Sequence, residues 1–383
     1  MPMPLCNRVV WLLALLIMPA DSAQPQDAQT QESVHAGRAS EVTAHIQQTF
    51  YSPRSGFYRF SVDERRPAYM WGCGIMFSTL AGAARHEPDQ YRPLLGQYFA
   101  ALDRYWDDAV DIPGYEPLPT RGGGNDKYYD DNAWMVLTFL EAYEMTGEDR
   151  YLNRADETLK FVLSGEDDRL GGGIWWHEEH KDGTKNTCSC APAAIGCLRL
   201  ANFREGDEAQ ALIDRAERLV DWTVENLQTP EGLFDDRIVV ETGEVKRGTL
   251  TYNSGLMIRA MLGLYRAKGD PARLEEAKRI AAACNRLVRR RTGVYRDPPR
   301  WSHLLVEADL ELYRTTKEPY LLARAKANAE YVYDRWKNNP PDDLMANASV
   351  TRMLWLLADT ETEVGREFWE RSDELANLLQ QTQ

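Results

Sequence analysis

Hydrophobic residues recur at intervals of three and four from about residue 34 to the end of the chain, the spacing of amphipathic α-helices. One such pattern covers 133–143 and stops at Gly147, a residue that commonly ends helices. A second pattern follows over 151–162 after a short turn. The sequence therefore predicts an antiparallel helical hairpin in this region.

Similar hairpins recur along the chain. Aromatic residues anchor corresponding positions of the copies at Tyr143, Phe203, Tyr265 and Tyr313. Helical patterns at 71–86 with 91–108, and at 346–360 with 363–380, follow the same plan, which gives five or six hairpins. Stacked repeats of this kind form either an open solenoid or a closed ring.

Long connections between the hairpins favour the closed ring. They cover 109–129, 165–189, 229–250 and 291–302, and they contain glycine, proline, aromatic and acidic residues. Loops of this length in a compact domain are usually functional, and a ring gathers them on one face. Within one of them, 237–245 reads as a small β-hairpin. We predict an all-α fold, an (α/α)6 toroid of helical hairpins, in a single domain over 34–383.

The N-terminus has the pattern of a secretory signal peptide. Arg8 precedes roughly ten apolar residues, and small residues follow near Ala20 and Ala23. The apolar run is too short for a stable membrane span. We therefore expect a signal peptide over 1–23, a disordered linker over 24–33, and a secreted or periplasmic protein.

Composition narrows the classes of function. Lys and Arg total 45 against 59 Asp and Glu, and the resulting net charge of −14 argues against nucleic-acid binding. Eleven Trp and 18 Tyr can provide platforms for flat ligand faces. The cysteines beyond the signal peptide are Cys73, Cys188, Cys190, Cys197 and Cys284; their odd number leaves at least one thiol unpaired within the chain.

One acidic doublet has a distinctive context. Asp130 and Asp131 follow the glycine-rich segment 121–124 and open the helix that contains Trp134. Nearby aromatic rings would desolvate one carboxyl and raise its pKa while the other stays ionised, the division that glycoside cleavage requires. The structural alternative is a helix N-cap followed by an acid that the helix dipole stabilises.

A second segment combines backbone freedom with aromatic rings. Three glycines at 171–173 precede Ile174, Trp175 and Trp176, and paired Trp residues offer a stacking face, although core packing is the alternative for one of them. His177 and His180 lie in the same loop, followed by Cys188 and Cys190. Their spacing is not a recognised zinc pattern, so we predict no metal site.

These segments resemble glycoside hydrolase family 76, the family of α-1,6-mannanases and their relatives. The resemblance is carried by 128–134, 171–176, 185–186 and 251–255, which read YYDDNAW, GGGIWW, KN and TYNSG, and it extends in order from about residue 40 to 360. It implies an (α/α)6 barrel and retaining hydrolysis of α-1,6-linked mannose. Asp130 would be the nucleophile and Asp131 the acid/base, with the carboxyls about 5 Å apart and with no cofactor or metal.

The resemblance also implies a set of sugar-binding residues and a partner. The set is Tyr129, Trp175, Trp176, Asn186, Asp235, Asp236, Tyr252 and Asn253. The expected partner is α-mannan or its oligosaccharides, bound by a monomer with no stable membrane span. Cys190 stands where many relatives would have Asn, and the loops 291–302 and 338–347 match only loosely. These departures leave the linkage and chain-length preference open.

Other classes share parts of this pattern. An unsaturated glucuronyl hydrolase or a sugar epimerase could use the same toroid, but epimerases of that shape use histidines as acid and base. Of six His here, His35 and His45 lie outside the loops. A polysaccharide lyase would need cations to neutralise a uronate, which an acidic cleft opposes. A non-catalytic glycan-binding protein would tolerate loss of one aspartate, and this chain retains both.

Overall fold

The structure, a computed structural model, describes residues 33–120, 124–181 and 183–382. Contacts within the chain define one compact unit from Ser33 onward. The expected signal peptide and linker lie outside the described residues except for Ser33, whose hydroxyl accepts a hydrogen bond from the Ala36 amide and caps the first helix. None of the described helices is long and apolar enough to cross a bilayer.

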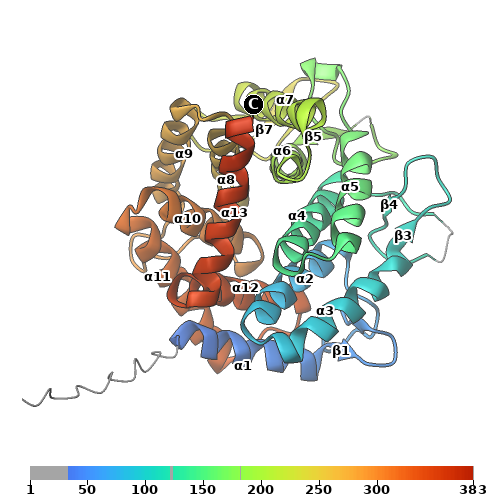
Figure 1. Cartoon of the computed structure of the whole chain (residues 1–383), viewed down its shortest axis with the longest axis vertical. Coiled ribbons are helices and arrows are strands. Elements are labelled where there is room, and N and C mark those ends of the chain that lie inside the picture. The colour runs from blue at the N-terminus through green and yellow to red at the C-terminus, as the bar shows by residue number, and fades with distance from the viewer. Residues whose placement is uncertain (1–32, 121–123, 182, 383) are drawn as a thin grey trace, which may run out of the picture. The chain divides into compact units, whose positions relative to one another are not determined.

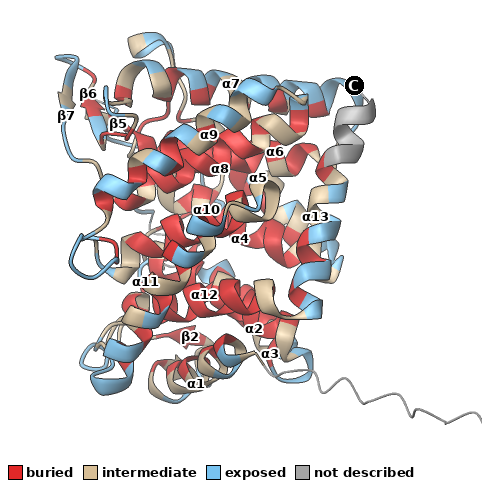
Figure 2. Ribbon diagram, turned by 90° about the vertical axis from the view of Figure 1, so that its left-hand side faces the viewer, coloured by how far each residue is buried: buried red, intermediate tan, exposed pale blue. Residues whose placement is uncertain are grey.

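Six helices form a closed inner ring. They are α2 (Met70–His86), α4 (Tyr129–Thr146), α6 (Thr187–Ala201), α8 (Thr251–Lys268), α10 (Pro299–Thr316) and α12 (Leu344–Glu361). Each packs against the next, and α12 packs against α2, so the ring has no open edge (Figure 1). Closure explains why these helices are buried on nearly every side, as Figure 2 shows for α4, α8 and α12.

A second layer of helices surrounds this ring. It consists of α1 (Val34–Thr49), α3 (Pro88–Leu102), α5 (Asp149–Leu163), α7 (Gly206–Leu227), α9 (Pro271–Ala283) and α11 (Pro319–Asn338). The last five pack against the inner helix that precedes them, whereas α1 packs against α12 and completes the sixth pair from the other end of the chain. The predicted (α/α)6 fold is confirmed.

The C-terminal helix departs from the expected plan. We predicted that 346–360 and 363–380 form a hairpin of the ring, but the place beside α12 is occupied by α1. Instead, α13 (Glu363–Thr382) packs against α2, α4, α8 and α12. The indole of Trp369 donates to Asp359 at 3.1 Å. Figure 2 shows α13 at the opposite end of the ring helices from β6 and β7, so it covers that end.

Short strands and 3-10 turns occupy the connections. The strands are β1 (Tyr51–Ser52), β2 (Phe57–Tyr58), β3 (Trp106–Asp107), β4 (Gly114–Tyr115), β5 (Thr184–Asn186), β6 (Arg237–Val239) and β7 (Glu244–Lys246), and the 3-10 turns are η1 (Asp103–Tyr105), η2 (Arg169–Gly171) and η3 (Cys284–Leu287). The β-hairpin expected at 237–245 is present as β6 and β7, and β5 extends it to three strands. The long loops precede the N-termini of the inner helices and therefore gather at one end of the ring.

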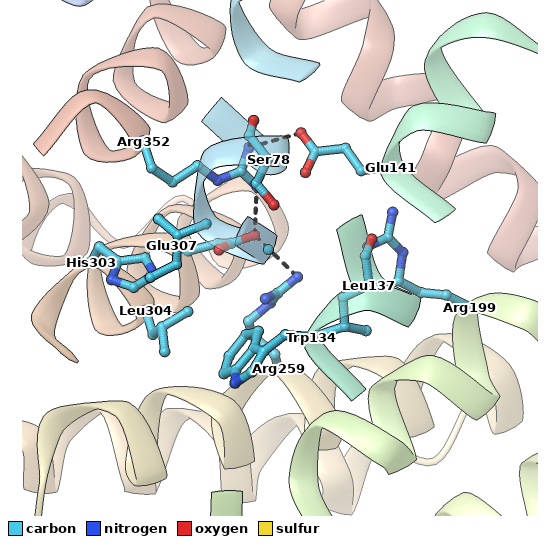
Figure 3. A pocket seen from close by; sticks show the side chains of 12 residues that line it. Ser78, Trp134, Leu137, Glu141, Arg199, Arg259, His303, Leu304, Glu307 and Arg352 are labelled. Carbon is cyan, nitrogen blue, oxygen red and sulfur yellow. Dashed lines mark hydrogen bonds and ion pairs between the residues drawn. The ribbon is translucent and has the colours of Figure 1, made fainter. Parts of the chain in front are cut away.

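The interior of the ring holds a network of buried ion pairs (Figure 3). Arg352 of α12 contacts Glu141 at 2.8 Å and Glu307 at 2.9 Å, and Arg259 of α8 contacts Glu307 at 3.2 Å. Burial opposes ionisation of Glu307, but the charges of Arg259 and Arg352 lower its pKa to about 2. The network therefore connects α4, α8, α10 and α12 beneath the loop end of the ring.

Candidate active site

A cavity of about 830 Å³ opens at the loop end of the ring. Every inner helix contributes to it from its first turn or from the residue just before. These residues are Tyr69, Trp71, Tyr128, Asp130, Asp131, Asn186, Cys188, Leu250, Tyr252, Trp301 and Met345, and α4 adds Trp134 from its second turn. Loops and the first residue of β6 complete the wall with Pro117, Leu118, Asn125, Asp126, Trp176, Asp236 and Arg237. A cavity of this size suits a small oligomeric ligand.

Asp130 lies in the first turn of α4, and three donors hold its carboxyl. The Trp176 indole N–H donates to Oδ2 at 3.0 Å, and the Cys188 thiol approaches the same oxygen at 3.4 Å. The Asp131 amide donates to Oδ1 at 3.0 Å. Burial raises the pKa of Asp130 to about 6, while the three donors act in the opposite direction. At neutral pH Asp130 is therefore mainly a carboxylate.

The environment of Asp131 favours its protonated form. Burial raises the pKa of its carboxyl well above the usual value, and the neighbouring charge of Asp130 raises it further. The two adjacent acids thus have different environments, because among the described residues only Asp130 has donors that favour its ionised form. This arrangement can supply a nucleophile or base and a proton donor at the same time.

Asp236 is another carboxylate in the cavity wall. It accepts hydrogen bonds at Oδ1 from the Tyr252 hydroxyl at 2.8 Å and from the Asn253 amide at 3.4 Å, and its Oδ2 pairs with Arg237 at 2.9 Å. Burial raises the pKa of Tyr252, so its phenol stays a donor. The ring of Trp301 lies 6.4 Å from that of Tyr252. Polar groups beside aromatic rings are suited to a hydroxyl-rich ligand with apolar faces.

The cavity brings together six of the predicted site residues: Asp130, Asp131, Trp176, Asn186, Asp236 and Tyr252. The other four lie elsewhere, which corrects their expected position. Trp175 is fully buried and donates to Asp167 at 2.8 Å, and Tyr129 is buried against Phe161 with ring centroids 5.0 Å apart.

Asp235 and Asn253 also lie outside the cavity wall. Both are buried, and Asp235 accepts a hydrogen bond from the Gly248 amide at 2.9 Å, which fixes the loop before α8. Asn253 donates to Asp236, so it acts on the cavity through a residue that does line it. Asp235 and Asp236 are consecutive residues just before β6, and their side chains serve the loop and the cavity respectively.

Several cavity residues did not emerge from the sequence as candidates. Tyr69, Trp71, Cys188 and Trp301 lie in the first turn of an inner helix or directly before it, and Trp134 lies one turn further into α4. That shared position is the signal that could have identified them, since it recurs once per hairpin. The Cys188 thiol approaches Asp130, whereas Cys190 accepts from the Ile174 amide at 3.2 Å.

One group of described residues has the composition of a metal site. Potential ligand atoms of Asp126, His177 and His180 all lie within 4.8 Å of one another. The Nδ1 atoms of His177 and His180 lie 2.8 Å and 2.6 Å from Asp126 Oδ2, which are hydrogen-bond distances. In this arrangement the group connects the loop before α4 to the loop after Trp176. All five cysteines of the described chain are unpaired thiols.

Comparisons with known proteins agree with this geometry. The family model of glycosyl hydrolase family 76 matches residues 35–298, and no curated protein matches the chain. A solved α-mannanase of family 76 from Bacteroides thetaiotaomicron is 24% identical, with a TM-score of 0.79 over 89% of this chain and 97% of its own. The α-1,6-mannanase of Salegentibacter sp. is 21% identical, with a TM-score of 0.71 over 85% of this chain and 99% of its own.

A more distantly similar structure contains a bound amino sugar. The Dfg5 protein of Chaetomium thermophilum, solved in complex with glucosamine, is 14% identical with a TM-score of 0.70 over 87% of this chain and 92% of its own. The structural similarities establish a shared fold, and the family model covers well over half of the chain. The chain therefore belongs to glycosyl hydrolase family 76 and is a glycoside hydrolase.

Proposed function

We propose that this glycoside hydrolase cleaves α-1,6-mannosidic bonds with retention of configuration, using Asp130 as nucleophile and Asp131 as acid/base. The observation that carries the proposal is the difference between the two acids. Three donors hold Asp130 as a carboxylate, while burial and the charge of Asp130 hold Asp131 protonated. A retaining glycosidase needs this pair on one cleft, with carboxyls about 5 Å apart.

In the first step, the Asp130 carboxylate attacks the anomeric carbon while Asp131 gives its proton to the departing glycosidic oxygen. The product is a mannosyl ester on Asp130 and a free sugar hydroxyl. Esterification removes the negative charge that had helped raise the Asp131 pKa. Asp131 is then a carboxylate that can accept a proton from the water that hydrolyses the ester.

The related enzymes support the choice of substrate and of residues. A variant of the Salegentibacter α-1,6-mannanase in which two adjacent aspartates are replaced by asparagine is inactive and was solved with α-1,6-mannotriose. The doublet Asp130-Asp131 is the adjacent pair that lines the cavity here. Because a mannan is a polymer outside the cell, the expected signal peptide is consistent with this substrate, and we propose a secreted or periplasmic location.

The proposal is tested by product analysis on an α-1,6-mannan backbone and on short α-1,6-manno-oligosaccharides. We expect Asp130→Ala and Asp131→Ala each to lose about 10³-fold or more in kcat, because each removes a group that acts in the transition state. With an aryl α-mannoside, whose leaving group needs no protonation, azide should restore turnover of Asp131→Ala and yield the α-glycosyl azide, whereas azide rescue of Asp130→Ala should yield the β-azide.

The matched control is Asp108→Asn, which alters one exposed acid away from the cavity and should leave hydrolysis unchanged. Unchanged turnover after either active-site substitution would contradict the assigned roles. Inactivity of the parent protein on every α-mannan, with the variants equally inactive, would show that the substrate is another glycan or that the protein only binds it.

A further inference from the structure

A second cavity, of about 840 Å³, lies at the same end of the ring as the active site. It is formed by the connection between α9 and α10, the end of α11 and the first turns of α10 and α12. The two cavities are adjacent along the chain, since Trp301 and Met345 line the first, and the neighbouring residues Arg300, Ser302 and Ala346 line the second. The first turns of α10 and α12 therefore line both cavities.

The second cavity is basic although the protein is acidic. The segment 286–300 carries six arginines and one acid in a chain whose net charge is −14. Arg289, Arg296, Arg300 and Arg335 line the cavity together with two carboxylates, Asp297 and Asp343. Guanidinium groups therefore outnumber carboxylates two to one in its wall.

Both carboxylates already serve the helices beside the cavity. Asp297 accepts from the Thr251 amide at 2.7 Å, at the start of α8, and Asp343 accepts from the Ala346 amide at 2.9 Å, at the start of α12. Their ion pairs with the cavity arginines are long, 3.8 Å from Asp297 to Arg296 and 3.5 Å from Asp343 to Arg300. They neutralise the arginines only in part.

The remaining two arginines have no acidic partner within the described part of the chain. Arg289 and Arg335 are exposed; Arg289 donates to the Arg296 carbonyl at 2.8 Å, and Arg335 reaches the Tyr331 hydroxyl at 3.5 Å. A guanidinium carries five N–H donors, so most donors of both side chains remain free. Such groups bind phosphate and sulfate oxygens through paired hydrogen bonds.

We propose that this arginine-lined cavity binds a tetrahedral oxyanion ester, phosphate or sulfate, carried by the glycan whose mannose chain occupies the active site. The inference rests on the proposed function for the glycan, and on the charge and donors of the cavity for the ester. A nucleic acid is the poorer fit, because a chain with a charge of −14 would repel a long polyanion while a single substituent meets only the cavity.

Binding is tested first without any glycan. Isothermal titration of the unaltered protein with inorganic phosphate and with inorganic sulfate should show one site that weakens as salt rises. Arg289→Gln with Arg335→Gln should weaken it at least tenfold. The matched control, Arg290→Gln with Arg291→Gln, removes the same charge from exposed arginines that follow Arg289 in its loop and do not line the cavity, and should change affinity less than twofold.

Thermal unfolding of both double variants shows whether the loop still folds, and Arg289→Lys with Arg335→Lys provides a second, more conservative pair. The lysine pair should retain part of the affinity because it keeps the charge and loses the paired donors. Absence of phosphate and sulfate binding to the unaltered protein, or equal losses in the two glutamine pairs, would overturn the proposal.

The coupling to the glycan is tested by hydrolysis of neutral, phosphorylated and sulfated α-1,6-manno-oligosaccharides. For the double variant Arg289→Gln with Arg335→Gln, we expect kcat/KM to fall about tenfold for either the phosphorylated or the sulfated substrate and to stay unchanged for the neutral one. The ester whose hydrolysis slows is the substituent that the cavity binds. An equal fall for neutral and esterified substrates would overturn the inference. Lack of hydrolysis of any mannan would refute the proposed function separately, since phosphate binding is measured without turnover.

Discussion

Replacing Asp130 by asparagine should stabilise the folded protein at neutral pH while it abolishes hydrolysis. Burial raises the pKa of this carboxyl from 3.8 to about 6. The protonated form therefore contributes stability that is fully present below about pH 3.8 and is lost as the pH rises through about 6. A difference of roughly two pH units corresponds to about 3 kcal/mol at pH 7.

The asparagine does not ionise, so the variant avoids the destabilisation that a buried charge at Asp130 causes at pH 7. Its side chain, however, accepts weaker hydrogen bonds from Trp176 and Cys188 than a carboxylate does. We therefore expect a net gain of about 1–3 kcal/mol in the free energy of unfolding at pH 7. At pH 4, where the parent carboxyl is protonated in the folded state, the gain should fall below about 1 kcal/mol.

Urea denaturation followed by circular dichroism at pH 4 and pH 7 measures both values. Asp108→Asn removes the same charge from an exposed acid and should change stability by less than about 0.5 kcal/mol at either pH. A variant at Asp130 that is less stable than the parent at pH 7, or equally stabilised at both pH values, would refute the claim that this carboxyl is held at a raised pKa.

Three further substitutions test separate parts of the structure. Trp176→Phe removes a donor from Asp130, so the pKa of that carboxyl should rise and the acid limb of the kcat/KM profile should move to higher pH by up to about one unit; a move to lower pH contradicts the assignment. Gly173→Ala should destabilise the protein by about 2 kcal/mol or more in thermal unfolding, since φ is +78° and a Cβ would lie 2.7 Å from the Trp222 ring; an unchanged Tm would show that the loop can relax. Glu141→Gln leaves two buried arginines short of a carboxylate and should cost about 3–5 kcal/mol in urea denaturation, whereas a neutral result would mean that the interior network contributes little to stability.

The fold could be predicted from sequence because each hairpin repeats the same local information. Helical periodicity, short turns such as the one at Gly147 and long loops between hairpins together specify a ring. The exception is α13, whose pattern resembles that of the ring helices. Its place depends on α1 packing beside α12, a contact between the two ends of the domain that no local pattern encodes.

The site was predictable to the level of segments, but not to the level of side-chain direction. Trp175 and Trp176 are neighbours in an extended segment, where Trp175 bridges to Lys185, so their side chains point to opposite sides. The sequence contains both rings and does not determine which one faces the cavity. The same holds for Asp235 and Asp236. Trp71 and Trp301 come from other hairpins, and they join the cavity only once the ring closes.

The central claim is that hydrolysis proceeds through a mannosyl ester of Asp130 with Asp131 as acid/base. It is tested most directly by proton NMR of the anomeric signal as the protein begins to hydrolyse a short α-1,6-manno-oligosaccharide. The mechanism predicts that the α-anomer appears first and the β-anomer only later by mutarotation. Initial release of the β-anomer would show single displacement by water and would contradict the assignment of Asp130 as nucleophile.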